Sequence, residues 1–171
     1  MRTEAYRRAF LRAVRFAALL AAACAPAAAA AQAKGPTVWE YAKVRDSHTG
    51  TDRHTIQTRI EYGDAAAALA FVCARRRLVL TVVSTWPISN ILRYRFPPES
   101  AQWIQGSTPV PSAAVFEGEE VQKLFETVLV RREMMVRIPG PRTVEEKTLD
   151  LEGFAEKAKP LMEACGIGKD E

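Results

Sequence analysis

The 171-residue sequence is poor in the residues and motifs that most often carry enzyme chemistry. It contains only two histidines and three cysteines, and it has no CxxC, HExxH, GxSxG or glycine-rich phosphate loop. These absences argue against disulfide exchange, zinc-dependent proteolysis, α/β-hydrolase chemistry and nucleotide binding through a phosphate loop. We therefore expect a protein that is not an enzyme and that uses no cofactor.

Long apolar runs are equally scarce. The run near the start of the chain covers residues 16–25, whereas a membrane-spanning helix needs roughly twenty apolar residues. This run follows five arginines and precedes a string of alanines, which is the order of a cleavable export signal. We expect residues 1–33 to be that signal. We expect residues 34–171 to form one β-rich domain that is not an integral membrane protein.

The export signal leaves its route and its processing open. Arg7 and Arg8 begin a short stretch that resembles the twin-arginine export motif, and a general secretory route fits the same region. Small residues allow cleavage after Ala31 or, as we prefer, after Ala33. A leucine four residues before Cys24 resembles a displaced lipobox, so lipidation is an alternative. We expect the product in the bacterial periplasm or outside the cell.

Charge of one sign is not in excess once the signal is set aside. The full chain carries 24 basic and 20 acidic residues, a formal net charge of +4. Residues 1–33 hold five arginines and one acidic residue, so residues 34–171 carry 19 residues of each sign. A neutral domain lacks the basic excess that favours binding to a phosphate backbone. We therefore expect no nucleic-acid partner.

Two cysteines, Cys73 and Cys165, remain after the signal is removed. An even pair in an exported protein favours a disulfide, and two buried free thiols are the alternative. In the chain-entropy model, a bridge that closes a loop of about ninety residues stabilises the fold by roughly 4–5 kcal/mol.

Alternation of apolar and polar residues predicts a mainly β fold with two helices. Period-two patterns predict strands within residues 38–44, 54–62, 78–83, 91–96, 103–104, 113–116, 133–138 and 144–151. Residues 65–73 are ambiguous, with a strand favoured for their second half. Helical spacing predicts helices over residues 118–130 and 154–165, the second kinked or starting late because of Pro160. The expected architecture is an antiparallel β-sandwich or strongly curved sheet, with the C-terminal helix packed on it.

Two groups of side chains are candidates for ligand binding. His48 and His54 each follow an aspartate two residues earlier, a combination that suits zinc or a similar ion, although turn preferences explain the same polar loop. Five arginines are candidates for a basic binding face, or for a solvated turn and strand surface. They are Arg75, Arg76, Arg77, Arg93 and Arg95. Trp39 and Trp103 are expected in the core or at its rim.

Scattered positions between residues 39 and 165 resemble two families of exported proteins. The positions are Trp39, Ser47, Thr49, Gly50, Cys73, residues 78–83, residues 93–96, Trp103, residues 121–138 and residues 149–165. Their succession resembles the VasI family of periplasmic type VI secretion accessory proteins and is similar to the invasion-associated locus B family. The resemblance implies an exported β-domain that acts through contacts with another envelope protein or through envelope binding. A small-ligand or metal-binding protein that uses the loop from Asp46 to His54 is the alternative.

Overall fold

The structure is a computed structural model that describes residues 37–45, 47, 50–139 and 145–168. These residues belong to one compact unit, Gly35–Glu171. The described strands are β1 (Glu40–Arg45), β2 (Asp52–Tyr62), β3 (Ala65–Ala74), β4 (Arg77–Ser84), β5 (Ile91–Arg95), β6 (Gln102–Gln105), β7 (Ser107–Val110), β8 (Ala113–Glu117), β9 (Glu133–Arg137) and β10 (Lys147–Asp150). The described helices are α2 (Glu119–Val130) and α3 (Phe154–Cys165).

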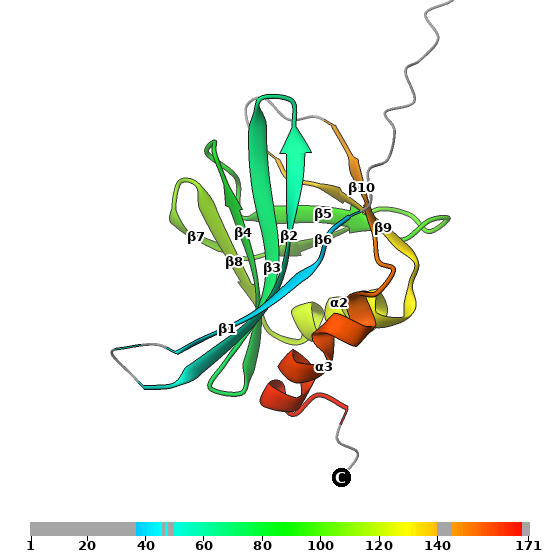
Figure 1. The fold of residues 1–171 in the computed structure, drawn as a ribbon. Coiled ribbons are helices and arrows are strands. Elements are labelled where there is room, and N and C mark those ends of the chain that lie inside the picture. The colour runs from blue at the N-terminus through cyan, green and yellow to red at the C-terminus, as the bar shows by residue number, and fades with distance from the viewer. Residues whose placement is uncertain (1–36, 46, 48–49, 140–144, 169–171) are drawn as a thin grey trace, which may run out of the picture. The chain divides into compact units, whose positions relative to one another are not determined.

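The strands form two antiparallel sheets. The larger sheet has six strands in the order β1-β2-β3-β4-β8-β7, and the smaller sheet has four in the order β10-β9-β5-β6. The strands of the smaller sheet run across those of the larger one (Figure 1). The predicted fold class is therefore confirmed: the domain is mainly β, with two antiparallel sheets and two helices.

Alternating burial gives each strand of the larger sheet an inner face. Along β2, Ile56, Thr58, Ile60 and Tyr62 are buried and the residues between them are more exposed. Successive side chains of a strand point to opposite faces, so these four residues share the inner face. Helix α2 shows the corresponding helical pattern, with its buried side chains spaced three and four residues apart. No helix among the described residues is long and apolar enough to cross a membrane.

The inner face of the larger sheet is covered partly by the smaller sheet and partly by the helices (Figure 1). Helix α3 packs on β1, β2 and β3, and α2 packs on β4 and β8. Between these helices and the sheet, the Phe71 ring lies 5.0 Å from Phe125 and 6.0 Å from Phe154. Trp39 meets Phe154 edge-on at 4.7 Å. This aromatic cluster holds the C-terminal helix on the sheet, as the sequence predicted.

The two sheets are joined on both sides. Between β6 and β7 the chain passes from the smaller to the larger sheet at Gly106, where an added Cβ would lie 2.1 Å from the Val115 carbonyl oxygen. On the other side, the Trp39 indole donates to the Asp150 carbonyl at 2.8 Å. The Asp150 amide donates to the Thr37 hydroxyl at 2.8 Å. The start of β1 is therefore tied to β10.

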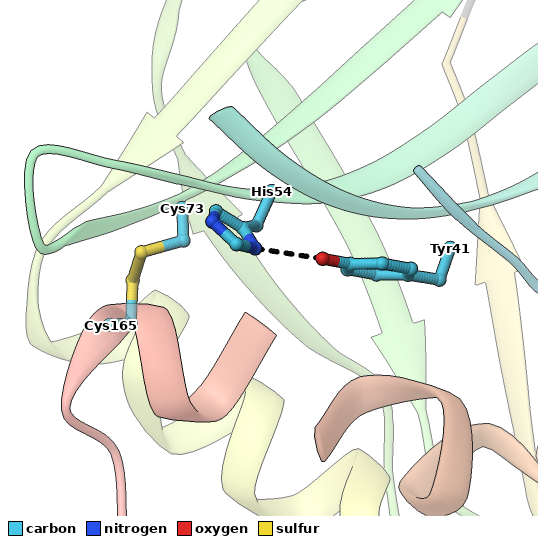
Figure 2. The surroundings of a disulfide bond; sticks show 4 residues. All are labelled: Tyr41, His54, Cys73 and Cys165. Carbon is cyan, nitrogen blue, oxygen red and sulfur yellow. Dashed lines mark hydrogen bonds between the residues drawn. A yellow bond between two sulfur atoms is a disulfide. The ribbon is translucent and has the colours of Figure 1, made fainter. Parts of the chain in front are cut away.

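The predicted disulfide between Cys73 and Cys165 is present. Its two Cα atoms are 5.7 Å apart, and it links positions 92 residues apart in sequence. Figure 2 shows it connecting β3 to the end of α3. The bridge fixes the last turn of the helix to the same sheet on which the aromatic cluster packs.

The structure settles three points on which the sequence prediction was incomplete or open. Strand β7 was not predicted, and it pairs with β8 directly after the Gly106 corner. Helix α3 begins at Phe154, so the late start considered because of Pro160 is not found. Strand β3 begins at Ala65, which resolves the ambiguous alanine-rich segment as strand over its whole length.

Candidate binding face

The histidine candidate of the first loop is engaged in the structure. The Tyr41 hydroxyl and Nδ1 of His54 are hydrogen-bonded at 2.8 Å, and Figure 2 shows the imidazole beside the disulfide. Asp52 is paired with Lys43 at 2.8 Å, and this hydrogen bond lowers the pKa of the Asp52 carboxyl. His48 lies outside the described residues. Within the described part of the chain, no three His, Cys, Asp or Glu side chains form a metal-binding group.

The five candidate arginines occupy two different sheets. Arg75 and Arg76 form the two-residue turn between β3 and β4 in the larger sheet, with φ angles of 53° and 62°. Arg77 begins β4, and its Nη2 lies 3.7 Å from Glu117. Arg93 and Arg95 lie on β5 of the smaller sheet. The structure therefore places the candidates as two separate groups.

Arg95 forms a paired interaction with Glu146. Its Nε donates at 3.0 Å and its Nη2 at 2.7 Å to the two carboxylate oxygens. This two-point geometry is the arrangement that guanidinium and carboxylate groups prefer. The hydrogen bonds hold the pKa of the Glu146 carboxyl below its usual range, and the charge of Arg137 acts in the same direction. Arg95 and Glu146 therefore anchor each other beside Arg137.

A row of side chains crosses three strands on the outer face of the smaller sheet. Trp103 on β6 is directly opposite Arg93 on β5, and Arg93 is opposite Arg137 on β9. In the next row, Arg95 is opposite Met135. Trp103 is 62% exposed, more than the other large aromatic side chains of the described chain. We call this surface the Trp103 face. Its members are Trp103, Arg93, Arg95, Arg137, Met135 and Glu146.

The Trp103 face carries a local excess of positive charge. It has three guanidinium groups and one carboxylate, Glu146, which is already paired with Arg95. Arg93 and Arg137 stand directly opposite each other, an arrangement of like charges that destabilises a sheet. Beyond Met135, Glu133 on β9 and Asp150 on β10 form the next cross-strand pair of like charges, and this pair is acidic. An acidic group placed near Arg93 would relieve its repulsion with Arg137.

Sequence reasoning found part of this face. Arg93 and Arg95 were candidates because they alternate with the apolar residues of one strand. The same alternation in β9, where Met134 and Val136 are buried, also places Arg137 on the outer face. Trp103 was expected in the core or at its rim, and that expectation is wrong, because its side chain is exposed on the outer face. It is next to Ile104, and period two alone does not decide which of two adjacent apolar residues faces inward.

No family model, curated protein or solved structure matches the chain. The resemblance to exported families therefore depends on the sequence pattern alone, and the assignment of a binding face depends on the geometry. That geometry suits recognition. Guanidinium groups bind carboxylates with two hydrogen bonds, and an exposed indole offers a large apolar surface at little cost in conformational entropy.

Proposed function

We propose that the chain is an exported domain, periplasmic or secreted, that works by binding another protein of the bacterial envelope and is not an enzyme. The observation that carries this proposal is the Trp103 face, where an exposed tryptophan stands opposite Arg93 in register. Arg93 has no ion pair among the described residues. The exposed Trp103 indole and the Arg93 guanidinium are therefore available to a partner.

The composition of the face supports a protein partner. Tryptophan, arginine and methionine are enriched in protein–protein interfaces, and tryptophan and arginine dominate their binding energy. Trp103, Arg93 and Met135 bring all three residue types together on adjacent strands. Lysine and glutamate, which interfaces disfavour, are represented by Glu146 alone.

Export is supported by two independent features. The first 33 residues have the order of basic, apolar and small residues that a cleavable signal has. The disulfide between Cys73 and Cys165 is of the kind that persists in oxidising compartments such as the periplasm. The scattered positions between residues 39 and 165 support a relationship to the VasI or invasion-associated locus B families, with a role as a secretion-system accessory for the first.

Charge reversal on the face tests the proposal. The exported protein carrying Arg93→Glu and Arg137→Glu is expressed in its own bacterium, and the envelope proteins that co-purify with it are compared with those of the wild type. We expect the variant to lose its specific partners because two attractive charges become repulsive. Identical partner lists for the variant and the wild type would rule the Trp103 face out as the binding site.

Arg53→Glu with Arg59→Glu is the matched control. Both arginines are exposed on β2 of the larger sheet, so the control makes the same change in net charge on another surface. It should retain the partners that the Arg93 and Arg137 variant loses. Both proteins should keep the disulfide and the wild-type melting temperature, which separates lost binding from lost folding.

A further inference from the structure

The smaller sheet ends at β6, and no other strand of the described residues lies beside this edge. The order of the sheet is β10-β9-β5-β6, so β6 pairs only with β5. An edge strand presents unpaired backbone N–H and C=O groups that can pair with another chain. The strand carries Trp103, so the open edge adjoins the Trp103 face.

The ladder geometry identifies which backbone groups point outward. The Gly106 amide donates to the Asn90 carbonyl at 2.8 Å, so these residues form a hydrogen-bonded pair. Hydrogen-bonded and non-hydrogen-bonded pairs alternate along an antiparallel ladder. Counting along the register, Trp103 and Gln105 belong to non-hydrogen-bonded pairs. Their N–H and C=O groups therefore point away from β5, towards the open edge.

The same alternation brings two side chains of the face together. Residues in a non-hydrogen-bonded pair have closer Cα atoms, about 4.5 Å apart, and closer side chains than those in a hydrogen-bonded pair. Arg93 and Trp103 form such a pair. The outward backbone groups of Trp103 thus lie next to a guanidinium and an indole on the outer face.

The other three sheet edges carry the protection that β6 lacks. Natural edge strands are shielded by charged residues, by proline or by a covering segment. Strand β10 is covered by Thr37 and Trp39, β7 contains Pro109, and β1 carries charged residues along its length. Strand β6 is protected only by its shortness, because it has four residues, contains no proline and lies in a segment, residues 101–116, without a charged side chain.

We propose that an extended acidic segment of the partner protein adds to the smaller sheet as a strand beside β6. This inference rests on the proposed function and names the chemistry of the partner. The segment's backbone pairs with the outward groups of Trp103 and Gln105. Alternate side chains of the segment lie on the outer face, where a carboxylate beside Trp103 reaches Arg93 on β5. Arg137 lies one strand further away on β9 and adds to the positive charge of the face. This is strand addition, with hydrogen bonds giving affinity and alternate side chains giving specificity.

A second copy of this chain is a poorer occupant of the edge. Pairing of two β6 strands about a two-fold axis would extend one sheet and bring two sets of guanidinium groups onto the same face. Like charges on neighbouring strands are unfavourable. An acidic segment offsets the charge of Arg93 and Arg137, whereas a second copy doubles it.

The probe is a blocked peptide that alternates glutamate and threonine, added to the isotope-labelled, disulfide-bonded protein purified after export. We expect the backbone amide signals of Trp103 and Gln105 to shift and the indole fluorescence to change. A lysine–threonine peptide and a glutamate–threonine peptide with every second amide N-methylated serve as comparisons. Both should bind at least about tenfold more weakly, because the lysine peptide carries the opposite charge and the N-methylated peptide lacks half of the backbone donors.

Gln105→Pro and Gln105→Thr form the matched pair of protein variants. Proline removes the outward N–H of residue 105 without removing a ladder bond to β5, whereas threonine keeps that N–H. We expect Gln105→Pro to weaken binding of the acidic peptide about five- to tenfold and Gln105→Thr to leave it unchanged. Thermal melting of both variants checks that the fold is retained.

The outcomes separate this inference from the proposed function. If Arg93→Glu abolishes binding while Gln105→Pro and N-methylation do not, the face binds but strand addition is wrong. If the acidic peptide produces no shift at Trp103 or Gln105 and the Arg93 and Arg137 variant keeps its envelope partners, both proposals fail. A concentration-dependent dimer of the protein alone that Gln105→Pro dissociates would show that a second copy occupies the edge instead.

Discussion

Gly106 is the residue at which the chain leaves the smaller sheet and enters the larger one. A Cβ at this position would meet the Val115 carbonyl oxygen at 2.1 Å and the Phe116 ring at 2.7 Å. Both neighbours are fixed, one as backbone and the other as a buried side chain. Glycine is needed at position 106 because a side chain would not fit. At Gly63 the surroundings are open, and glycine is favoured there because the φ angle of 65° is positive.

Gly106→Ala should therefore destabilise the fold by about 3 kcal/mol, because β6, β7 and β8 cannot separate without losing backbone pairing. Gly63→Ala should cost only about 1 kcal/mol, the usual penalty for a left-handed residue that gains a Cβ. Urea unfolding of the two variants measures the difference. Equal losses would mean that the corner is less tightly packed than the contacts at Gly106 indicate.

Arg75 and Arg76 occupy turn positions that usually carry asparagine and glycine. Their positive φ angles of 53° and 62° are costly for residues with a Cβ. Arg75→Asn combined with Arg76→Gly should raise the free energy of unfolding by about 1–2 kcal/mol and the melting temperature by a few degrees. Arg77→Asn is the control because Arg77 is in β4, and it should give no gain. A combined variant that melts no higher would contradict the turn geometry.

The buried hydroxyl of Tyr62 makes the stability of the domain depend on pH. Its ring stacks edge-on against Trp86 at 5.3 Å, and Lys147 Nζ lies 5.3 Å from its centroid. Burial raises the pKa of the Tyr62 hydroxyl to about 12. In the unfolded chain the hydroxyl ionises near pH 10, as in model peptides. Between these values the unfolded state binds fewer protons than the folded state, so stability falls as pH rises.

Tyr62→Phe removes this linkage. Chemical unfolding at intervals from pH 8 to pH 12 should show a smaller loss of stability between pH 10 and pH 12 for the variant than for the wild type. The difference between the two curves isolates Tyr62 from the other groups that titrate at high pH. Curves that fall in parallel would contradict a raised pKa for this hydroxyl.

At the level of elements, the periodic strands and both helices could be predicted from sequence. Strand β2 and helix α2 each bury one face, so their residue patterns directly reflect their environment. Strand β7 could not be predicted because its four residues are all exposed and include Pro109. It is a strand because Gly106 directs it alongside β8. Strand β3 was ambiguous because alanine favours helix, and pairing with β2 and β4 overrides that preference.

The candidate site could be predicted only where a residue's face followed from its own strand. Arg93 was found in this way. The juxtaposition of Trp103, Arg93 and Arg137 depends on the pairing of β6, β5 and β9. A loop separates β5 from β6 in the sequence, and strands β7 and β8 and helix α2 separate β6 from β9. The residue pattern of a single strand does not indicate which strands it will pair with, because strand register is set by packing between distant parts of the chain.

The disulfide is the one covalent link between helix α3 and the larger sheet. Replacing Cys73 and Cys165 together with alanine should lower the free energy of unfolding by roughly 4–5 kcal/mol, because the unfolded chain regains the freedom of a loop spanning 92 residues. Urea unfolding of the variant, of the oxidised wild type and of the reduced wild type provides the measurement. The variant and the reduced wild type should unfold alike. Two reactive thiols in unreduced, denatured wild-type protein would contradict the bridge.

At the scale of the whole molecule, the proposed removal of residues 1–33 changes the net charge of the exported protein. The full chain has a formal net charge of +4, and the part from residue 34 onward has 19 basic and 19 acidic residues. Positive charge is then a property of local groups of arginines, the Trp103 face and the Arg75 to Arg77 turn among them, instead of a property of the whole surface. Selectivity for an acidic partner segment follows, because a neutral molecule attracts anions only where its cations are grouped.

Processing at the proposed site has a direct physical consequence. If residues 1–33 are removed, native isoelectric focusing should move the exported protein from the basic region towards neutrality, because five arginines leave with only one acidic residue. Intact-mass measurement decides between cleavage after Ala31 and after Ala33, and a lipid on Cys24 would appear as added mass. Arg7→Lys with Arg8→Lys should abolish the neutral form if export uses the twin-arginine route and leave it unchanged if the general secretory route is used. A protein recovered outside the cytoplasm that still focuses as a basic species would overturn cleavage, and with it the argument that the Trp103 face is a local basic patch on a neutral molecule.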